Sequence, residues 1–183
     1  MESKTTVEIR PITKADTSAI LRWRNSERVV KNFIYQAPLT EQEHLTWIKS
    51  QVETGKCHQF IMQESATGFA FGTIYLRDVD YQHKKAEYGI YIGEDSALGK
   101  GYAIEASRQI LHYAFHTLHL NKVFLRVLAG NEKAMRTYRA CGFVPEGRFR
   151  QDVFVNGHFE DVIFMSVLEV NGHENAELCY PLL

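Results

Sequence analysis

Alternating apolar and polar positions predict most of the strands in this chain. The pattern, often with β-branched and aromatic residues, covers residues 5–10, 58–64, 69–77, 86–92 and 122–128. Small and polar residues separate the second segment from the third, which predicts a hairpin. Two last strands meet at Asn156-Gly157, a pair that favours a two-residue hairpin turn.

Capping residues mark the starts of two predicted helices in the N-terminal third. Thr13 and Asp16 have the spacing of a capping box, in which each side chain bonds the backbone N–H of the other residue. Thr40 and Glu43 repeat this spacing before a second helix, which we expect to end near Gly55.

Two further helices are predicted after residues 86–92 and 122–128. The first begins near Tyr102, and its inner stripe starts with small residues that would let it lie close to the sheet. This stripe comprises Ala103, Ser107, Ile110, Ala114 and Leu118. The second is short, with Asn131 as its N-cap and Gly142 as its C-terminal stop.

The composition fits one globular domain with a substantial core. The 183 residues are 45% apolar and carry a formal net charge of −1, which argues against a nucleic-acid partner. No apolar run approaches the ~18–20 residues of a membrane helix, and the first residues do not resemble a signal peptide. We therefore expect a cytoplasmic protein without a membrane partner. Three cysteines without C-x-x-C spacing indicate neither a disulfide framework nor a zinc site.

The segment Leu98-Gly99-Lys100-Gly101-Tyr102-Ala103 lies between a predicted strand and a predicted helix. Its glycines let the backbone approach a ligand closely, and a helix N-terminus offers unpaired N–H groups and favours negative charge. The segment therefore predicts a cradle for a phosphate or pyrophosphate. A glycine-rich turn that only reverses the chain is the alternative that this segment alone leaves open.

Counting residues disfavours two nucleotide-binding motifs. A P-loop has four residues between its first glycine and Gly-Lys, followed by Ser or Thr. Here five residues separate Gly93 from Gly99, and Gly101 follows the lysine. A dinucleotide fingerprint would need glycine where Ile104 stands.

The helix that starts after Asn131 carries an amide and a phenol on one face. Asn131, Met135 and Tyr138 have the spacing i, i+4, i+7, which places their side chains along one side of a helix. In the order and spacing of this pair and the glycine loop, the chain resembles the GCN5-related N-acetyltransferases (GNAT superfamily). The resemblance runs over residues 7–168 and is strongest from 86 to 168.

The resemblance implies a fold and a cofactor. The fold is α+β, with one domain at residues 1–170, a C-terminal tail at 171–183, and a mixed, mostly antiparallel sheet of about seven strands flanked by about four helices. The cofactor is acetyl-CoA as acetyl donor, without a metal. The implied cofactor-binding residues are Ile90, Tyr91, Ile92, Leu98, Gly99, Lys100, Gly101, Tyr102, Ala103, Asn131, Ala134 and Tyr138. Leu98 stands where the family usually has Gln or Arg, so backbone amides would hold the phosphates.

Within the superfamily the chain is similar to the branch of ribosomal-protein N-terminal and spermidine acetyltransferases. That branch commonly has Ala-Glu-aromatic in its central strand, here Ala86-Glu87-Tyr88, and a final hairpin like residues 153–161. The resemblance implies direct transfer of an acetyl group from acetyl-CoA to a primary amine in a ternary complex. The acceptor would be a small molecule or a peptide, of the protein N-terminus, polyamine or amino-sugar type, and the family also allows a homodimer.

This chemistry needs proton transfer at two places. An alkylamine with a pKa of about 10 is mostly protonated at neutral pH, and we expect Glu87 to take its proton, directly or through water. The departing CoA thiolate needs a proton donor, and Tyr138 has the phenol for this role. A backbone N–H near Tyr91 or Ile92 would stabilise the oxyanion. An exposed strand carboxylate and a tyrosine that only packs are the structural alternatives.

The acceptor site is the least specified part of the sequence. In the superfamily the first two helices and the final hairpin form its walls, which implies Trp23, Arg24, Asn25, Phe33, Tyr35, His44, Trp47, Tyr75 and Phe154. A polyamine would need several convergent carboxylates, whereas the arginines near Trp23 suit an acceptor that carries a carboxylate or phosphate. Both acceptor types stay open at this point.

Other patterns favour competing functions weakly. His112, His116 and His119 share a helix face, but no carboxylate partner of a metal motif accompanies them. Cys141 follows a helix C-terminus, which raises a thiol pKa, so a packing role is favoured over a nucleophile. A non-catalytic acyl-CoA-binding module and a nucleotide-binding enzyme remain as the alternatives to an acetyltransferase.

Overall fold

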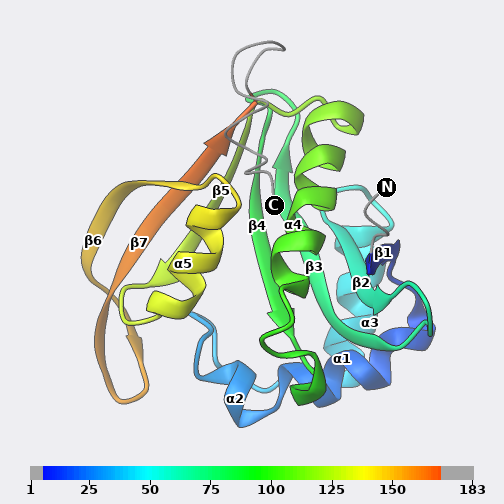
Figure 1. Ribbon diagram of the computed structural model, residues 1–183. Coiled ribbons are helices and arrows are strands. Elements are labelled where there is room, and N and C mark those ends of the chain that lie inside the picture. The colour runs from blue at the N-terminus through cyan, green and yellow to red at the C-terminus, as the bar shows by residue number, and fades with distance from the viewer. Residues whose placement is uncertain (1–5, 170–183) are drawn as a thin grey trace.

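A computed structural model describes residues 6–169 and shows a seven-stranded sheet with helices on both faces (Figure 1). The strands are β1 (Val7–Pro11), β2 (His58–Glu64), β3 (Ala70–Asp80), β4 (Lys85–Ile92), β5 (Lys122–Leu128), β6 (Val144–Val155) and β7 (His158–Leu168). Their order is β1-β2-β3-β4-β5-β7-β6. All neighbours are antiparallel except β4 and β5, which are parallel. The α+β class and the seven strands are confirmed, while the tail expected at 171–183 lies outside the described residues.

Within residues 6–169, five α-helices, with short 3₁₀ and π turns, connect and cover the strands. The helices are α1 (Thr17–Arg24), α2 (Glu27–Val30), α3 (Glu41–Trp47), α4 (Tyr102–His112) and α5 (Glu132–Ala140). The turns are η1 (Lys14–Asp16), η2 (Ile48–Val52), η3 (Asp95–Ala97) and η4 (Tyr113–Thr117). The additional helix relative to the expected four is α2, whose single turn is too short to give a hydrophobic period.

Local signals for helix ends and turns are confirmed. The Thr40 hydroxyl accepts from the Glu43 N–H at 3.3 Å, and the Glu43 carboxylate accepts from the Thr40 N–H at 2.8 Å. Thr13 forms a capping box with Asp16, although its first turn is the 3₁₀ turn that leads into α1. Asn156 and Gly157 have φ values of 53° and 82°, as a type I′ hairpin turn requires.

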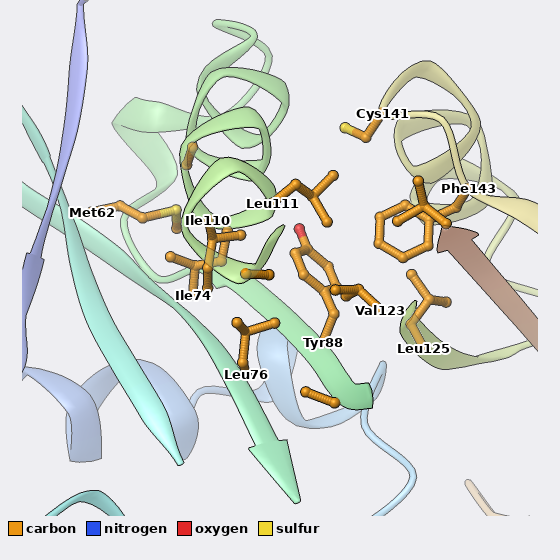
Figure 2. Close-up of a cluster of buried hydrophobic side chains, with 14 of the residues drawn as sticks. Met62, Ile74, Leu76, Tyr88, Ile110, Leu111, Val123, Leu125, Cys141 and Phe143 are labelled. Atoms are coloured by element: carbon orange, nitrogen blue, oxygen red, sulfur yellow. The ribbon is translucent and has the colours of Figure 1, made fainter. Parts of the chain in front are cut away.

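The largest core cluster lies between the sheet and helices α4 and α5. Figure 2 shows Ile74, Leu76 and Tyr88 of the sheet facing Ile110 and Leu111 of α4. The buried positions of α4 and η4 are Ala106, Ser107, Ile110, Leu111 and Ala114. Three positions of the expected stripe, Ser107, Ile110 and Ala114, are thus buried, and Leu118 is partly buried against the same cluster. Ala103 is only partly buried, and the buried face also includes Ala106 and Leu111.

Strands β4 and β5 pair over only three positions. Their register joins Lys85 with Lys122, Ala86 with Val123, and Glu87 with Phe124, and then ends. Beyond Glu87 the two strands diverge, and β4 continues beside β3 while β5 continues beside β7 (Figure 1). The divergence leaves one side of β4 without a neighbouring strand.

Candidate active site

The divergence of β4 from β5 contains a pocket of about 260 Å³. Its walls come from β3, β4, β5, α5 and the segment 28–35, which includes part of α2. The expected site residues that line it are Phe33, Tyr35, Tyr75, Glu87, Ile90, Tyr91, Ile92, Leu98, Ala103, Asn131, Ala134 and Tyr138. Residues from distant parts of the sequence therefore meet at one opening in the sheet.

Strand alternation gives the pocket two ends. Tyr75 pairs with Gly89 and Arg77 with Glu87, so these side chains share one face of the sheet, and Arg126 reaches Glu87 from β5. This end, with Phe33 and Tyr35, is called the acceptor end below. Tyr88 and Ile90 point to the opposite face, where α4 and α5 pack. We call that side the donor end.

The glycine loop at the start of α4 has the backbone expected of an anion cradle. Gly99 and Gly101 have φ values of 75° and 79°, in the left-handed region that favours glycine. Within residues 6–169, the N–H groups of Gly99, Lys100 and Gly101 have no hydrogen-bond acceptor. A Cβ atom added at either glycine would meet nothing within 4 Å, so the loop is open on this side. These properties fit a phosphate held by backbone amides.

Two side chains of this loop do not line the pocket. The Tyr102 hydroxyl donates to Glu64 at 2.9 Å, and its ring packs on Phe71 at 4.9 Å between centroids. Lys100 lies 3.6 Å from the same Glu64 carboxylate. The Tyr102 side chain holds the loop against β2, whereas the Lys100 side chain is 47% exposed and makes the longer contact with Glu64.

The open side of β4 offers backbone groups to the pocket. Gly93, directly after β4, donates its N–H to the Phe71 carbonyl of β3 at 2.7 Å. Counting back from Gly93 therefore shows which N–H groups of β4 point toward β3. Because the bonding side alternates along an antiparallel pair, Tyr91 also points its N–H toward β3, whereas Ile90 and Ile92 point theirs toward the opening. The expectation of an oxyanion contact from Tyr91 was therefore wrong, and the Ile92 alternative stays compatible with the geometry.

Tyr138 projects from α5 toward the pocket. Its ring makes edge contacts with Tyr88 at 5.9 Å and Phe143 at 6.0 Å between centroids. Burial, reinforced by the nearby Tyr75 hydroxyl and Cys141, raises the pKa of Tyr138 well above its usual value. The phenol is therefore protonated throughout the physiological range and can act as a donor. Asn131 caps α5 by accepting from the Ala134 N–H at 3.1 Å, which fixes the helix start.

Glu87 is held by two arginines rather than exposed as a free base. Arg126 donates to it through Nε at 3.0 Å and Nη2 at 3.2 Å, and Arg77 Nη2 lies 3.0 Å from Oε2. Although burial opposes the charged form, hydrogen bonds and charge from both arginines lower the pKa of Glu87 below its usual value. A carboxylate so stabilised is a weaker base than an ordinary glutamate. The geometry therefore disfavours the expected role as a base.

Tyr75 forms a wall of the acceptor end because its neighbour is glycine. A Cβ atom at Gly89 would lie 2.2 Å from Cζ of Tyr75, so the ring rests directly on the β4 backbone. Phe33 contacts Tyr91 edge-on at 5.5 Å between centroids. Three of the nine expected acceptor residues, Phe33, Tyr35 and Tyr75, thus line the pocket.

Four expected acceptor residues lie elsewhere. Trp23 is buried against Gly93 and donates to Glu94 at 2.6 Å, and Phe154 is 65% exposed against Phe159 on the β6–β7 hairpin. His44 is buried, with Nδ1 3.1 Å from the Thr17 hydroxyl, and Trp47 donates to Gln59 at 3.2 Å. None of the four lines the pocket, since their side chains pack between elements or face solvent.

Arg24 and Asn25 act on the wall of the pocket from behind. Arg24 donates to the Tyr35 carbonyl, and its guanidinium lies 4.0 Å from the centroid of the Phe33 ring. Asn25 exchanges two hydrogen bonds with the Leu39 backbone, both of 2.8 Å. Neither residue lines the pocket. They hold the segment that carries Phe33 and Tyr35, which corrects their expected role as direct contacts.

Sequence reasoning missed Arg77, Arg126 and Gly89. Arg77 follows the mainly apolar run 70–76 and Arg126 lies between Leu125 and Val127, and a charge in such a setting indicates a paired, partly buried group. The described residues contain no group of three His, Cys, Asp or Glu side chains suited to a metal. His112 and His116 stack on each other at 4.3 Å between ring centroids. No helix within residues 6–169 is both long and apolar enough to span a membrane.

The fold and this site define an acetyltransferase. Residues 6–144 match the model of the acetyltransferase (GNAT) domain family, and the chain belongs to this family. The resemblance inferred from the glycine loop and the Asn131–Tyr138 helix is thereby confirmed.

Named relatives agree with this class. Spermidine N(1)-acetyltransferase of Vibrio cholerae is 30% identical over 145 residues, which are 79% of this chain and 83% of the relative. Its counterpart in Escherichia coli strain K12 is 27% identical over 169 residues, 92% and 89% of the two chains. The crystal structure of the Vibrio cholerae spermidine N-acetyltransferase with CoA and spermine has a TM-score of 0.84 and 26% identity, and the match covers 90% of this chain and 96% of that one. The protein is an acetyl-CoA-dependent N-acetyltransferase.

Acetyl-CoA fits the donor end by the observations above. The cradle supplies unpaired N–H groups for a pyrophosphate, and the open side of β4 supplies N–H and C=O groups for an arm that contains amides. When bound, acetyl-CoA supplies an activated acetyl thioester.

Proposed function

We propose that the enzyme acetylates a primary amine directly in a ternary complex, with the donor between β4 and β5 and the amine at the acceptor end. One observation carries this proposal, namely that the divergence of β4 and β5 connects the two ends of a single pocket. Tyr138 stands on the donor side of this opening and Tyr75 on the acceptor side. Cys141 is buried with a raised thiol pKa, which argues against an acetylated cysteine as intermediate.

Tyr138 is the proposed proton donor to the departing sulfur. Its raised pKa keeps the hydroxyl protonated. The Ile92 N–H is the proposed contact for the oxyanion, since it points toward the opening. Gly99, Lys100 and Gly101 hold phosphate through their N–H groups, and the side chain of Leu98 adds little to this contact.

The acceptor amine loses its proton without a side-chain base of neutral pKa. The pocket is lined by arginine, tyrosine, one lysine and Glu87 as titratable groups, and Glu87 is committed to Arg77 and Arg126. The positive charge of these arginines lowers the pKa of an amine bound elsewhere in the same pocket, because like charges disfavour the protonated form. The amine is therefore proposed to arrive partly neutral and to release its proton to water.

Two relatives are named as spermidine acetyltransferases, which makes a polyamine one candidate acceptor. A polyamine carries several positive charges and needs carboxylates around it. Within the described chain, Glu87 is the one carboxylate that lines this pocket. The names of the relatives therefore favour a polyamine acceptor, whereas the positive charge of the pocket disfavours one.

A thiol-release assay with acetyl-CoA and a panel of primary amines tests the proposal. We expect release that depends on the amine, on acetyl-CoA and on Tyr138, and a product with an added acetyl group by mass spectrometry. Binding of acetyl-CoA without release on any amine would support the non-catalytic acyl-CoA-binding alternative. Acetyl-enzyme formed in the absence of an amine would contradict direct transfer.

A further inference from the structure

The acceptor end presents cations to its ligand and keeps its carboxylate behind them. The Glu87 side chain is 7% exposed, whereas the side chains of Arg77 and Arg126 are 24% and 30% exposed. Both guanidinium groups bond to the same carboxylate. A ligand that enters from the acceptor end therefore meets the two arginines, here called the arginine pair, before it meets Glu87.

The arginine pair has one positive charge more than its shared carboxylate. Asp78 is the other acidic neighbour, 3.8 Å from Arg77 Nε, but its side chain is 71% exposed and its charge is largely screened. Arg126 has no carboxylate other than Glu87 within 4 Å in the described chain. The cluster is therefore positive on the side of Arg126.

Neighbouring charges do not remove this excess. Arg28 also lines the pocket, but Asp95 lies 2.7 Å from its Nε and it donates to the Ile92 and Gly93 carbonyls. Arg24 lies behind Phe33 and donates to the Tyr35 carbonyl rather than to a carboxylate. It adds positive potential to the same end.

We infer that the acceptor is a primary amine that also carries a carboxylate or phosphate group, bound by Arg126 and Arg77. This inference rests on the proposed acetyl transfer to an amine. Nε and Nη2 of both arginines already contact Glu87, so their Nη1 groups are left to donate charge-assisted hydrogen bonds to such an anion. The partial burial of the pair strengthens the attraction. The same charges repel a polyamine.

The aromatic walls define the part of the acceptor between amine and anion. Phe33 and Tyr75 line the same pocket as the arginine pair, as does Tyr35, which is 60% exposed. A short apolar spacer between amine and anion would pass between these rings. The site thus selects a compact amino acid-like or amino phosphate-like molecule, or an end of a larger one.

Acceptors matched in length test the inference. For chain lengths of two to six carbons, kcat/KM is measured for the ω-amino acid, its neutral amide, the diamine and the aminoalkyl phosphate, with spermidine added. We expect the acid or the phosphate to exceed the amide and the diamine of equal length at least tenfold. The preferred anion separates a carboxylate acceptor from a phosphate acceptor. Higher kcat/KM for the diamine, the amide or spermidine overturns the inference and leaves the acetyltransferase function standing.

The variant Arg126→Gln tests whether the arginine pair causes the preference for anionic acceptors. We expect kcat/KM for the preferred anionic acceptor to fall at least tenfold and that for its amide to change less than threefold, with acetyl-CoA affinity retained. A purely structural role of Arg126 would lower both values equally, which would contradict the inference. Arg136→Gln removes an exposed arginine of α5 that pairs with Glu132 and is the matched control.

Arg77→Gln is the second variant, for use if Arg126→Gln does not fold. It leaves the forked Glu87–Arg126 contact intact and is expected to lower the ratio of acid to amide in the same direction. An unchanged ratio in Arg77→Gln would count against the inference. Absence of thiol release with every acceptor, while acetyl-CoA binds, would instead contradict the proposed function.

Discussion

Arg126 holds Glu87 in a forked contact, with Nε 3.0 Å from Oε1 and Nη2 3.2 Å from Oε2. Glu87 is also the last residue of β4 that pairs with β5. The contact therefore joins the two strands at the point where they begin to diverge. This position gives Glu87 a structural importance that a catalytic base would not require.

Replacement of Glu87 by Gln should destabilise the protein more than it changes the chemistry. Loss of the charge leaves two partly buried arginines without their anion, and we expect the free energy of unfolding to fall by about 2 kcal/mol at pH 7. The folded-state pKa of Glu87 lies below its unfolded value. Its stabilisation is thus complete above the unfolded pKa and is lost as pH falls through the folded pKa.

Urea denaturation at a series of pH values measures this difference. The gap between wild type and Glu87→Gln should close as the pH falls below about 4. A constant gap over this range would contradict the lowered pKa. A shift in the pH dependence of kcat at saturating acceptor, with stability unchanged, would restore the role of a base.

Tyr138→Phe should lower turnover while acetyl-CoA still binds. The ring keeps its contacts with Tyr88 and Phe143, but the hydroxyl that would protonate the sulfur is absent. General acid catalysis contributes about a hundred- to ten-thousandfold, so we expect a loss of at least about a hundredfold in the rate of acetyl transfer. Single-turnover kinetics at saturating acceptor measure this step, because slow product release can hide it. A loss of less than tenfold in the rate of acetyl transfer would exclude Tyr138 as the proton donor.

Gly101→Val should weaken acetyl-CoA binding, whereas Leu98→Ala should change it less than threefold. Gly101 has a φ of 79°, and a β-branched residue there costs about 1–3 kcal/mol or moves the backbone. Displacement of the cradle N–H groups reduces affinity for the phosphates, and we expect a loss of about tenfold by isothermal titration calorimetry. Equal losses in both variants would show that side chains, rather than amides, bind the cofactor.

The value of kcat/KM should rise with pH up to the pKa of the free acceptor amine. The absence of a neutral-pKa base among the described pocket residues leaves the fraction of neutral amine as the controlling quantity. Plots of log kcat/KM against pH are expected to have a slope near 1 below the amine pKa. Acceptors with amines of lower pKa should shift the profile to lower pH by the same amount. A profile fixed near pH 6–7 for every acceptor would indicate a protein base instead.

Signals that depend on neighbouring residues predicted much of the fold. The capping box at Thr40, the N-cap at Asn131 and the turn at Asn156 each involve groups within a few residues, so sequence spacing describes them fully. The strands at 58–64 and 122–128 have the expected bounds. The single turn of α2 gave no such signal.

The acceptor end depends on contacts that sequence spacing does not contain. Arg126 is 39 residues from Glu87, and their contact requires the parallel pairing of β4 and β5. His44 lies on a correctly predicted helix, but its contact with Thr17, 27 residues away, turned it into the interior. Helix existence could be predicted there, whereas the direction of the side chain could not.

Because β4 and β5 pair at only three positions, the sheet consists of two parts that are joined at one short junction. On one side of it β1 to β4 form a half-sheet, and on the other β5 to β7 form a second, with Glu87 and its arginines as a cross-link at their shared end. A donor that bonds along the free side of β4 would lie between these two halves. Occupancy of the donor end would then slow amide hydrogen exchange at Ile90 and Ile92, whose N–H groups face this space.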